Sequence, residues 1–420
     1  MRAIDLFCLC LFPMFAVTAS ADDDKEYADD SFIRNNPEFE ADGGSLTDTV
    51  DISKYPFVSI SENFIRLNGT DWSMLADAFS RSEATPVRIV HIGDSHVQAD
   101  MSTGYTRRLL QNRYGSAGRG LIVPLEIAGT NEPQDYSITS TSSFSSEKLL
   151  KYPWSSKMGF TGVSLTPMSS DFDFRISASE AFERMYIYYH GNSLNVSSVD
   201  YNGSPLVYAV DDQVGCIEVG LPFPCEEITV SLSSFGEVSV YGMELVSDMI
   251  GVVYHSIGIN GATYMSYGRV EDFGRSIAML EPRLIIVSLG TNEAFGRLDV
   301  GEFEAQIDRL VNDIRTNNPQ AGLMLVTPAE CQRRLRRRRG SSYAVNDRVA
   351  TVRETINRYG REHGVAVYDW YEVAGGKGSS TQWIKAGLFS RDRIHYSRQG
   401  YELSGYMLYE AIVNSLNSDR

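Results

Sequence analysis

The alternation of apolar and polar residues changes character along the chain. From about residue 86 onward, short apolar runs rich in β-branched residues are each followed by a segment with helical spacing. The apolar runs predict five buried strands, over 87–92, 250–254, 284–289, 322–326 and 365–369. The intervening segments predict helices over 101–114, near 265–280, 302–317 and 344–363, and over 398–416. Such alternation is typical of an α/β fold, here a five-stranded parallel sheet sandwiched by helices.

A different pattern separates the first and second of these strands. Residues 136–248 contain runs in which apolar and polar residues alternate with period two, divided by Gly, Asn, Ser and Pro turns. The clearest runs are 172–176, 185–189, 228–232 and 238–241. We therefore expect residues 136–248 to form an inserted all-β sandwich. The α/β domain is then discontinuous and comprises residues 53–135 and 249–420.

The N-terminus is typical of an export signal. Arg2 precedes an apolar stretch, residues 6–17, that is too short to span a bilayer, and Ala19-Ser20-Ala21 is a small-residue cleavage pattern. We predict a signal peptide over 1–21, and hence a periplasmic or secreted product without a transmembrane segment. Residues 22–52 follow as an acidic leader with a net charge of about −9 over residues 22–51.

Composition and charge narrow the function classes. The 420 residues are 43% hydrophobic and 22% charged, which is ordinary for globular domains and excludes a wholly disordered chain. The formal net charge of −16 argues against nucleic acid as a partner. The exception is a basic run, Arg333 to Arg339, directly after the fourth strand. It is either a solvated loop or a grip for an anionic polymer, and the sequence leaves both open.

The cysteines of the mature chain also leave alternatives. Cys216 and Cys225 flank a proline-containing turn, and they form either a disulfide bond or two half-buried thiols. Cys331 has no neighbouring residues in a nucleophile or metal pattern. His91, His190 and His255 lie in strand-like surroundings without a partner at metal-ligand spacing, so we interpret them as structural. The sequence predicts no metal and no cofactor.

Four short polar blocks follow strands of the predicted sheet. Ligands bind at the carboxyl ends of strands in such sheets, so these blocks are expected to meet at one edge. Each block alone is a weak indication of an active site, but the four together, in this order, are a specific one. They are Gly93-Asp94-Ser95-His96, Gly258-Ile259-Asn260-Gly261-Ala262, Gly290-Thr291-Asn292-Glu293 and Asp392-Arg393-Ile394-His395.

In these blocks the chain resembles the SGNH (GDSL-type) hydrolases, which contribute Ser, Gly, Asn and His from four such positions. The resemblance covers about 86–135 and 250–417 and implies the flavodoxin-like fold of that family. The Gly93 block, the segment 115–120 and the insert before the second block resemble more narrowly the bacterial peptidoglycan O-acetylesterases. In those proteins the insert is similar to a carbohydrate-binding module, which is what the resemblance implies for residues 136–248.

The residue types fit ester hydrolysis, which needs an activated hydroxyl, a base and donors for an oxyanion. Ser95, at the start of a helix, is the candidate nucleophile. His395 is the candidate base, and Asp392, three residues earlier, is placed to hold its Nδ1–H. The oxyanion hole is expected from the N–H groups of Ser95 and Gly261 and the side-chain amide of Asn292. We choose Gly261 over Gly258 because it directly precedes the turn into a helix.

The sequence therefore predicts an exported serine esterase that removes O-acetyl groups from a carbohydrate polymer. By resemblance the first choice of polymer is O-acetylated peptidoglycan. The alternatives are a deacetylase of acetylxylan or another polysaccharide, an O-acetyltransferase that uses the same serine, and a glycan-binding protein with an inactive hydrolase domain. The roles of three further residues stay open. His96 either touches substrate or points away, and Trp370 and Trp383 either line the site or belong to the core.

Overall fold

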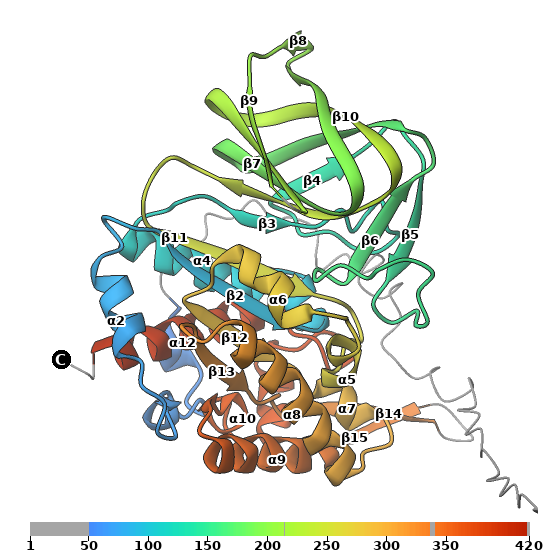
Figure 1. Cartoon of the computed structure of the whole chain (residues 1–420). Coiled ribbons are helices and arrows are strands. Elements are labelled where there is room, and N and C mark those ends of the chain that lie inside the picture. Colours follow the sequence, from blue (N-terminus) through green and yellow to red (C-terminus); the bar gives the residue numbers. More distant parts are fainter. Residues whose placement is uncertain (1–49, 214, 337–340, 418–420) are drawn as a thin grey trace, which may run out of the picture.

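The computed structural model describes residues 50–213, 215–336 and 341–417 of the chain (Figure 1). The predicted signal peptide, nearly all of the acidic leader, and Arg337 to Arg339 of the basic run lie outside these residues. The described chain has a helix-covered α/β half and a β-rich half stacked on it (Figure 1). No helix in the described ranges is both long enough and apolar enough to cross a membrane.

The central sheet of the α/β half has six strands in the order β1-β16-β13-β12-β2-β11. The strands span Ile65–Arg66 (β1), Val87–Gly93 (β2), Val252–Gly258 (β11), Leu284–Ser288 (β12), Gly322–Val326 (β13) and Ala366–Tyr368 (β16). Five of them pair in parallel, whereas β1 runs antiparallel to β16. The predicted five-stranded parallel sheet is thus a six-stranded mixed sheet, because the edge strand β1, with only two residues, is too short to show in the hydrophobic pattern.

One predicted strand is also displaced. The run 250–254 was expected to be a strand, but β11 begins at Val252 and continues through His255 to Gly258. Ile250 is 41% exposed, and Gly251 has a φ of 141°, so the chain turns there. His255 is fully buried and accepts a hydrogen bond from the Leu121 N–H, which makes a polar residue compatible with the middle of a buried strand.

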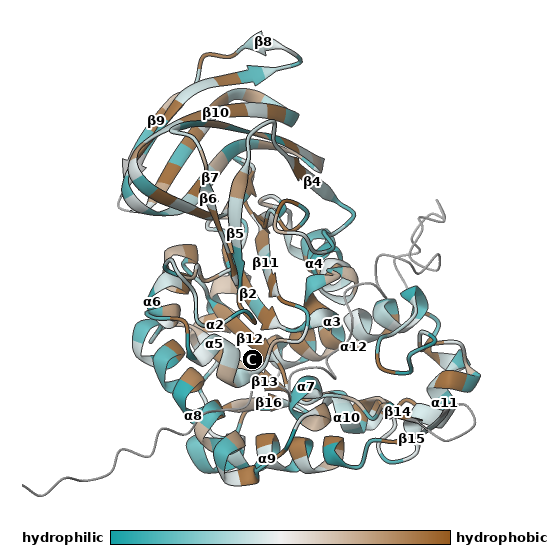
Figure 2. Cartoon of the chain, turned by 90° about the vertical axis from the view of Figure 1, so that its right-hand side faces the viewer, coloured by the Kyte–Doolittle hydropathy of each residue, from teal (hydrophilic) through white to brown (hydrophobic). Residues whose placement is uncertain are grey.

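Helices cover both faces of this sheet, and Figure 2 shows hydrophobic residues concentrated on its strands. Alternate residues of β2 point to opposite faces: Ile89 packs in the core cluster with α2, α4 and α12, and Val90 packs in the cluster with α5, α6, α8 and α9. The helices span Ser73–Ser80 (α2), Ser95–Gln98 (α3), Met101–Tyr114 (α4), Tyr264–Gly268 (α5), Phe273–Ile277 (α6), Thr291–Phe295 (α7), Val300–Asn317 (α8), Arg348–His363 (α9), Trp370–Val373 (α10), Ser379–Lys385 (α11) and Arg398–Asn417 (α12).

The β-rich half is an antiparallel sheet of eight strands. The four predicted runs merge into two strands of 31 residues each, β7 and β10, which pair with each other through repeated register shifts. Bulges of this kind bend strands and let one strand serve a strongly curved sheet. The strands are Gly120–Ile122 (β3), Tyr136–Thr139 (β4), Phe144–Lys148 (β5), Val163–Pro167 (β6), Asp171–Tyr201 (β7), Ser204–Pro205 (β8), Ala209–Gln213 (β9) and Cys216–Val246 (β10).

Two cysteines of this sheet settle an open alternative. Cys216 and Cys225 are both buried on β10, and both are thiols rather than partners in a disulfide bond. Cys216 lies opposite Tyr188 and Cys225 opposite Phe182 on β7, so neither cysteine faces the other across the ladder. Of the two alternatives, two buried thiols is therefore the one observed.

The two halves share one hydrophobic core. The cluster that contains Val90 of β2 and Ile257 of β11 also contains Leu121 of β3 and Leu245 of β10. Apolar burial of this kind is the main favourable contribution to folding. The insert is consequently packed as part of the same body as the hydrolase strands rather than attached as a separate module.

Candidate active site

Ser95 is the first residue of α3, directly after strand β2. Asp94 caps this helix, its carboxylate accepting a hydrogen bond from the His96 N–H at 3.0 Å. Two glycines allow α3 to lie close against the strand ends. A Cβ on Gly258 would stand 2.1 Å from the Gln98 nitrogen, and one on Gly93 would stand 2.4 Å from a Val97 methyl group. The glycines of the sequence blocks therefore set the position of Ser95.

The side chains of Ser95, His395 and Asp392 are connected by consecutive hydrogen bonds, although 300 residues separate the serine from the histidine. The Ser95 Oγ is 2.8 Å from the His395 Nε2. The His395 Nδ1 is 2.5 Å from one carboxylate oxygen of Asp392. The other Asp392 oxygen accepts hydrogen bonds from the backbone N–H groups of Ile394 and His395, at 2.9 and 3.0 Å. The three predicted residues are thus brought together with both imidazole nitrogens engaged.

His395 and Asp392 each shift the pKa of the other. Burial of His395 disfavours its charged form, but the hydrogen bond and negative charge of Asp392 outweigh burial, and the pKa of His395 is raised. Burial likewise opposes ionisation of Asp392, and the hydrogen bond from His395 nevertheless holds the pKa of Asp392 below its usual value. A carboxylate that stays ionised beside the imidazole favours a proton on Nδ1 and leaves Nε2 to face Ser95.

Asn292 and Gly261 lie at the neighbouring strand ends. Asn292 is in α7 after β12, and its Nδ2 donates to the Ala262 carbonyl at 3.0 Å and to Asp94 at 3.3 Å. Gly261, directly before Ala262, has a φ of 80°, a left-handed conformation that favours glycine. Through its two hydrogen bonds, Asn292 joins the loops that follow β2, β11 and β12. Burial raises the pKa of the Asp94 carboxyl, one of its two partners, to about 6.

The sequence did not single out Gln98, which fixes the second block. Its Oε1 accepts a hydrogen bond from the Asn260 N–H at 2.6 Å, and its Nε2 donates to Thr130 and to Asn131 at 2.8–3.0 Å. Gln98 is buried at the end of α3, so it links the helix that carries Ser95 to the loop that carries Gly261. The only signal in the sequence was its place three residues after Ser95.

His96 packs beside the triad histidine. Its ring centroid is 5.3 Å from that of His395, and the Tyr401 hydroxyl is 3.2 Å from its Nδ1. Burial lowers the pKa of His96 to about 3, so it is neutral near pH 7. Trp370 and Trp383 are both buried; Trp370 donates from Nε1 to the Tyr396 hydroxyl and Trp383 to the Ala374 carbonyl. Both tryptophans belong to a core cluster, and Trp370 also lines a cavity together with Asp94 and His96.

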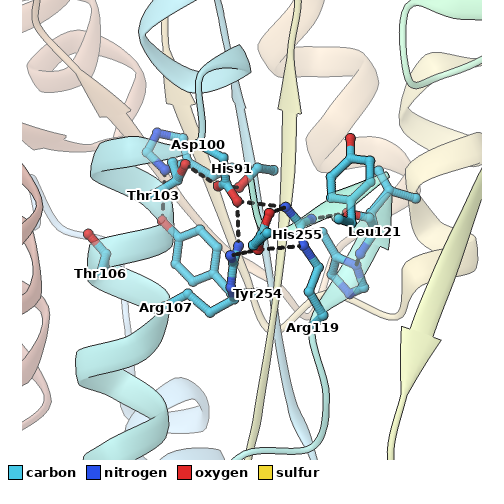
Figure 3. A network of polar contacts seen from close by, with 12 residues as sticks. His91, Asp100, Thr103, Thr106, Arg107, Arg119, Leu121, Tyr254 and His255 are labelled. Carbon is cyan, nitrogen blue, oxygen red and sulfur yellow. Dashed lines mark hydrogen bonds and ion pairs between the residues drawn. The ribbon is translucent and has the colours of Figure 1, made fainter. Parts of the chain in front are cut away.

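A buried network of ions ties this site to the segment that leads into the insert (Figure 3). The Asp100 carboxylate lies 2.9 Å from Arg107 and 2.7 Å from Arg119, and Asp135 lies within 2.9 Å of the same two arginines. The Ser256 hydroxyl of β11 also donates to Asp100. Despite burial, the two guanidinium groups hold the pKa of Asp135 well below its usual value. Four charges thus join α4, β11 and residues 119–135.

The basic run begins on a strand instead of in a loop. Gln332–Arg336 (β14) and Ser341–Val345 (β15) form a two-stranded hairpin. The hairpin contacts the residues on both sides of Asp392: the Arg393 guanidinium lies 4.1 Å from the Tyr343 ring centroid and donates to Gln332, and the Tyr343 hydroxyl donates to the Arg391 carbonyl. The exposed Arg334 is therefore carried by an element that contacts the Asp392 loop.

One group of side chains in the described ranges has ligand atoms close enough to hold a metal ion. Glu304, Glu362 and His363 place these atoms within 4.8 Å of one another. They lie on α8 and α9, and Glu362 and His363 are exposed. None of them takes part in the hydrogen-bonded groups around Ser95 described above.

The fold and these strand-end groups agree with a family match. Residues 235–403 match the model of the GDSL-like Lipase/Acylhydrolase family, a range that includes Gly261, Asn292, Asp392 and His395. Over these residues the chain is similar to that family, which supports hydrolysis of ester bonds.

One solved structure extends the likeness in fold to most of the chain. The structure titled "Peptidoglycan O-acetylesterase in action, 5 min" has 20% sequence identity and a TM-score of 0.69, over 86% of this chain and 99% of that one. The lipase/acylhydrolase from Enterococcus faecalis has 18% identity and a TM-score of 0.30, over 39% of this chain and 77% of that one. An acetyl xylan esterase, AlAXEase, has 16% identity and a TM-score of 0.31, over 38% and 81%. No curated protein sequence matches the chain.

Proposed function

We propose that this protein is an exported serine esterase that removes O-acetyl groups from peptidoglycan. The observation that carries the proposal is the hydrogen-bonded line from Ser95 Oγ through His395 to Asp392, at the sheet edge where Gly261 and Asn292 also lie. The roles follow from the chemistry of acyl transfer, in which a serine hydroxyl needs a neighbouring base and that base needs an orienting group.

In the first half of the reaction, His395 Nε2 takes the proton of Ser95 as Oγ attacks the acetyl carbonyl carbon. Negative charge then develops on the carbonyl oxygen, and the N–H groups of Ser95 and Gly261 and the amide of Asn292 are its donors. The Asn292 N–H that lies 3.3 Å from Asp94 makes the longer of its two hydrogen bonds and is the one we assign to the oxyanion. Collapse of this intermediate breaks the bond to the sugar oxygen, which leaves with the proton held by His395.

In the second half, water replaces the sugar. His395 accepts a proton from that water, whose oxygen attacks the acetyl-Ser95 carbonyl carbon, and the same donors hold the second oxyanion. The intermediate collapses to acetate and Ser95, which recovers its proton from His395. Asp392 keeps the imidazole oriented and stabilises its charged form through both steps.

Three observations support peptidoglycan as the polymer. The solved peptidoglycan O-acetylesterase shares the fold over 99% of its chain. The predicted signal peptide over 1–21 would deliver the protein to the periplasm or the outside, where peptidoglycan is found. The arginine-bearing hairpin contacts the Asp392 loop, and its cations would attract wall carboxylates.

Acetate release from two polymers tests this proposal. We expect the wild-type protein to prefer O-acetylated peptidoglycan to acetylxylan, and to lose part of that preference at high salt, because ions screen such attraction over about 10 Å at 0.1 M. Changing Arg336 to Arg339 to Ser should remove the salt dependence and leave hydrolysis of an aryl acetate unchanged. A preference for acetylxylan would contradict the substrate. Transfer of acetyl to an added sugar acceptor in place of acetate release would identify a transferase.

A further inference from the structure

An aromatic pair on the insert faces solvent close to the hydrolase helices. The loop between β5 and β6 presents Tyr152, which is 55% exposed, beside the half-buried Trp154. Their ring centroids are 5.1 Å apart and the rings are nearly perpendicular. A large aromatic ring left in solvent carries an apolar face that a ligand would cover.

The loop that carries this pair is held by hydrogen bonds at its base. The Glu147 carboxylate accepts four of them, from the N–H and hydroxyl groups of Ser155 and Ser156, at 2.6–3.0 Å. Slight burial disfavours the charged form of Glu147. The hydrogen bonds from the two serines outweigh this effect and lower the pKa of Glu147 to about 2, so the carboxylate stays ionised. Trp154 also donates from Nε1 to the Lys148 carbonyl at 3.1 Å. The aromatic pair is thus preorganised rather than loosely tethered.

The same loop contacts both sides of the segment that carries Gly261. On one side, Gly162 at the end of the loop lies so close to Ile259 that a Cβ there would stand 2.5 Å from its side chain. On the other side, Arg269, directly after α5, places its guanidinium 5.0 Å from the Tyr152 ring centroid. Gly261 precedes α5 and Arg269 follows it, so this helix, about 7 Å long, separates the Tyr152 contact from the oxyanion segment.

We infer that Tyr152, Trp154 and Arg269 form a subsite for a sugar of the glycan strand whose acetyl group reaches Ser95. The inference rests on the proposed function and names where the insert meets its substrate. The C–H face of a sugar ring would pack on the exposed Tyr152 ring, and Arg269 would pair with its hydroxyl or carboxylate oxygens. Since α5 separates the subsite from the oxyanion segment, it would hold a sugar further along the strand than the acetylated one.

The position predicts a dependence on chain length. For the wild-type protein, kcat/KM for acetate release should rise from an O-acetylated disaccharide to O-acetylated peptidoglycan strands of several disaccharides. In Tyr152→Ala the value on long strands should fall about tenfold, the size of one aromatic contact, while the values on the disaccharide and on p-nitrophenyl acetate stay unchanged. Tyr152→Phe keeps the ring and should retain most of the wild-type activity on long strands.

A matched control separates the subsite from a general effect of an exposed aromatic residue. Phe235 is 73% exposed on β10 of the same insert, and Phe235→Ala should leave all three substrates unaffected. If Tyr152→Ala matches the wild type on long strands, the subsite is wrong while the proposed function stands. If the wild type cleaves p-nitrophenyl acetate but releases no acetate from any glycan, the proposed function itself is wrong.

Discussion

At the scale of single residues, the side chains at the strand ends are joined by hydrogen bonds between loops that are distant in the chain. Ser95, His395 and Asp392 form the expected hydrogen-bonded line, and Asn292 lies beside it. What the sequence did not reveal was the second set of partners. Asp94 both caps α3 and accepts from Asn292, a double use that depends on loops distant in the chain. Their catalytic roles stay predictions until variants are measured.

Asn292 should contribute to the transition state and not to substrate binding. We expect Asn292→Ala to lower kcat by about 10²–10³ with little change in KM, the usual cost of one oxyanion donor. The measurement is steady-state kinetics on an aryl acetate, with circular dichroism to show that the fold is retained. A variant with normal kcat and a raised KM would remove Asn292 from the oxyanion hole.

Loss of the base should lower the activity more than loss of its orienting carboxylate. His395→Ala should lower kcat/KM by about 10²–10⁴, and Asp392→Asn should be milder. Because neutral His395 is the active form and its pKa is raised, activity should fall as pH drops through that raised pKa. Asp392→Asn removes a group that raises this pKa, so the acid limb of its kcat/KM profile should move to lower pH. The opposite ranking, or an unmoved limb, would refute the assigned roles.

At the scale of elements, periodicity predicted the α/β half well and the insert less well. The segment predicted as a helix over 101–114 is α4, and four of the predicted strands lie within one residue of the bounds of β2, β12, β13 and β16. The errors have physical causes. The polar residues His255 and Ser256 end the apolar run in the middle of β11, and β1 is too short to show any alternation. In the insert, bulges carry β7 and β10 past the turn residues that had suggested separate strands.

Gln98 provides a test of how the elements position one another. Gln98→Ala removes the acceptor of the Asn260 N–H and should lower kcat about tenfold by loosening the segment that carries Gly261, with hydrolysis of an aryl acetate as the assay. Gln111→Ala is the control, since Gln111 is also buried and donates to two carbonyls, but near β11 and residue 118. If both variants lose kcat equally, Gln98 has no particular role at the site.

At the scale of the whole molecule, the insert and the hydrolase half form one packed body. They share a core, and a buried network of four charges together with residues 130 and 131 holds the segment that leads into the insert against the site. Replacing residues 136–248 with a linker would therefore expose strands of the hydrolase half, so point variants such as Tyr152→Ala are the sharper probes of the insert. Sequence alone could not predict this, because shared burial is a property of the packing between segments.

A buried carboxylate near the insert should make the stability depend on pH. Burial raises the pKa of Glu132 from 4.5 to about 8, and one of its oxygens is buried without a hydrogen-bond partner. The folded state then binds the proton more tightly than the unfolded chain, so this contribution to stability is full below pH 4.5 and is lost as pH rises through about 8. Glu132→Gln should raise the thermal midpoint at pH 9 relative to the wild type.

The matched control for this prediction is Glu180→Gln, at an exposed glutamate of β7. It should leave the difference in midpoint between pH 5 and pH 9 unchanged. The account of Glu132 fails if its Gln variant shows the same pH dependence as the wild type.

The most direct measurement of the central claim is hydrolysis by Ser95→Ala together with covalent labelling of the wild type. We predict that Ser95→Ala hydrolyses an aryl acetate at near background rate and releases no acetate from O-acetylated peptidoglycan, with an unchanged fold. A serine-reactive phosphonate should label the wild-type protein at Ser95 alone. Wild-type turnover in Ser95→Ala, or labelling at another residue, would contradict the claim that this serine is the nucleophile.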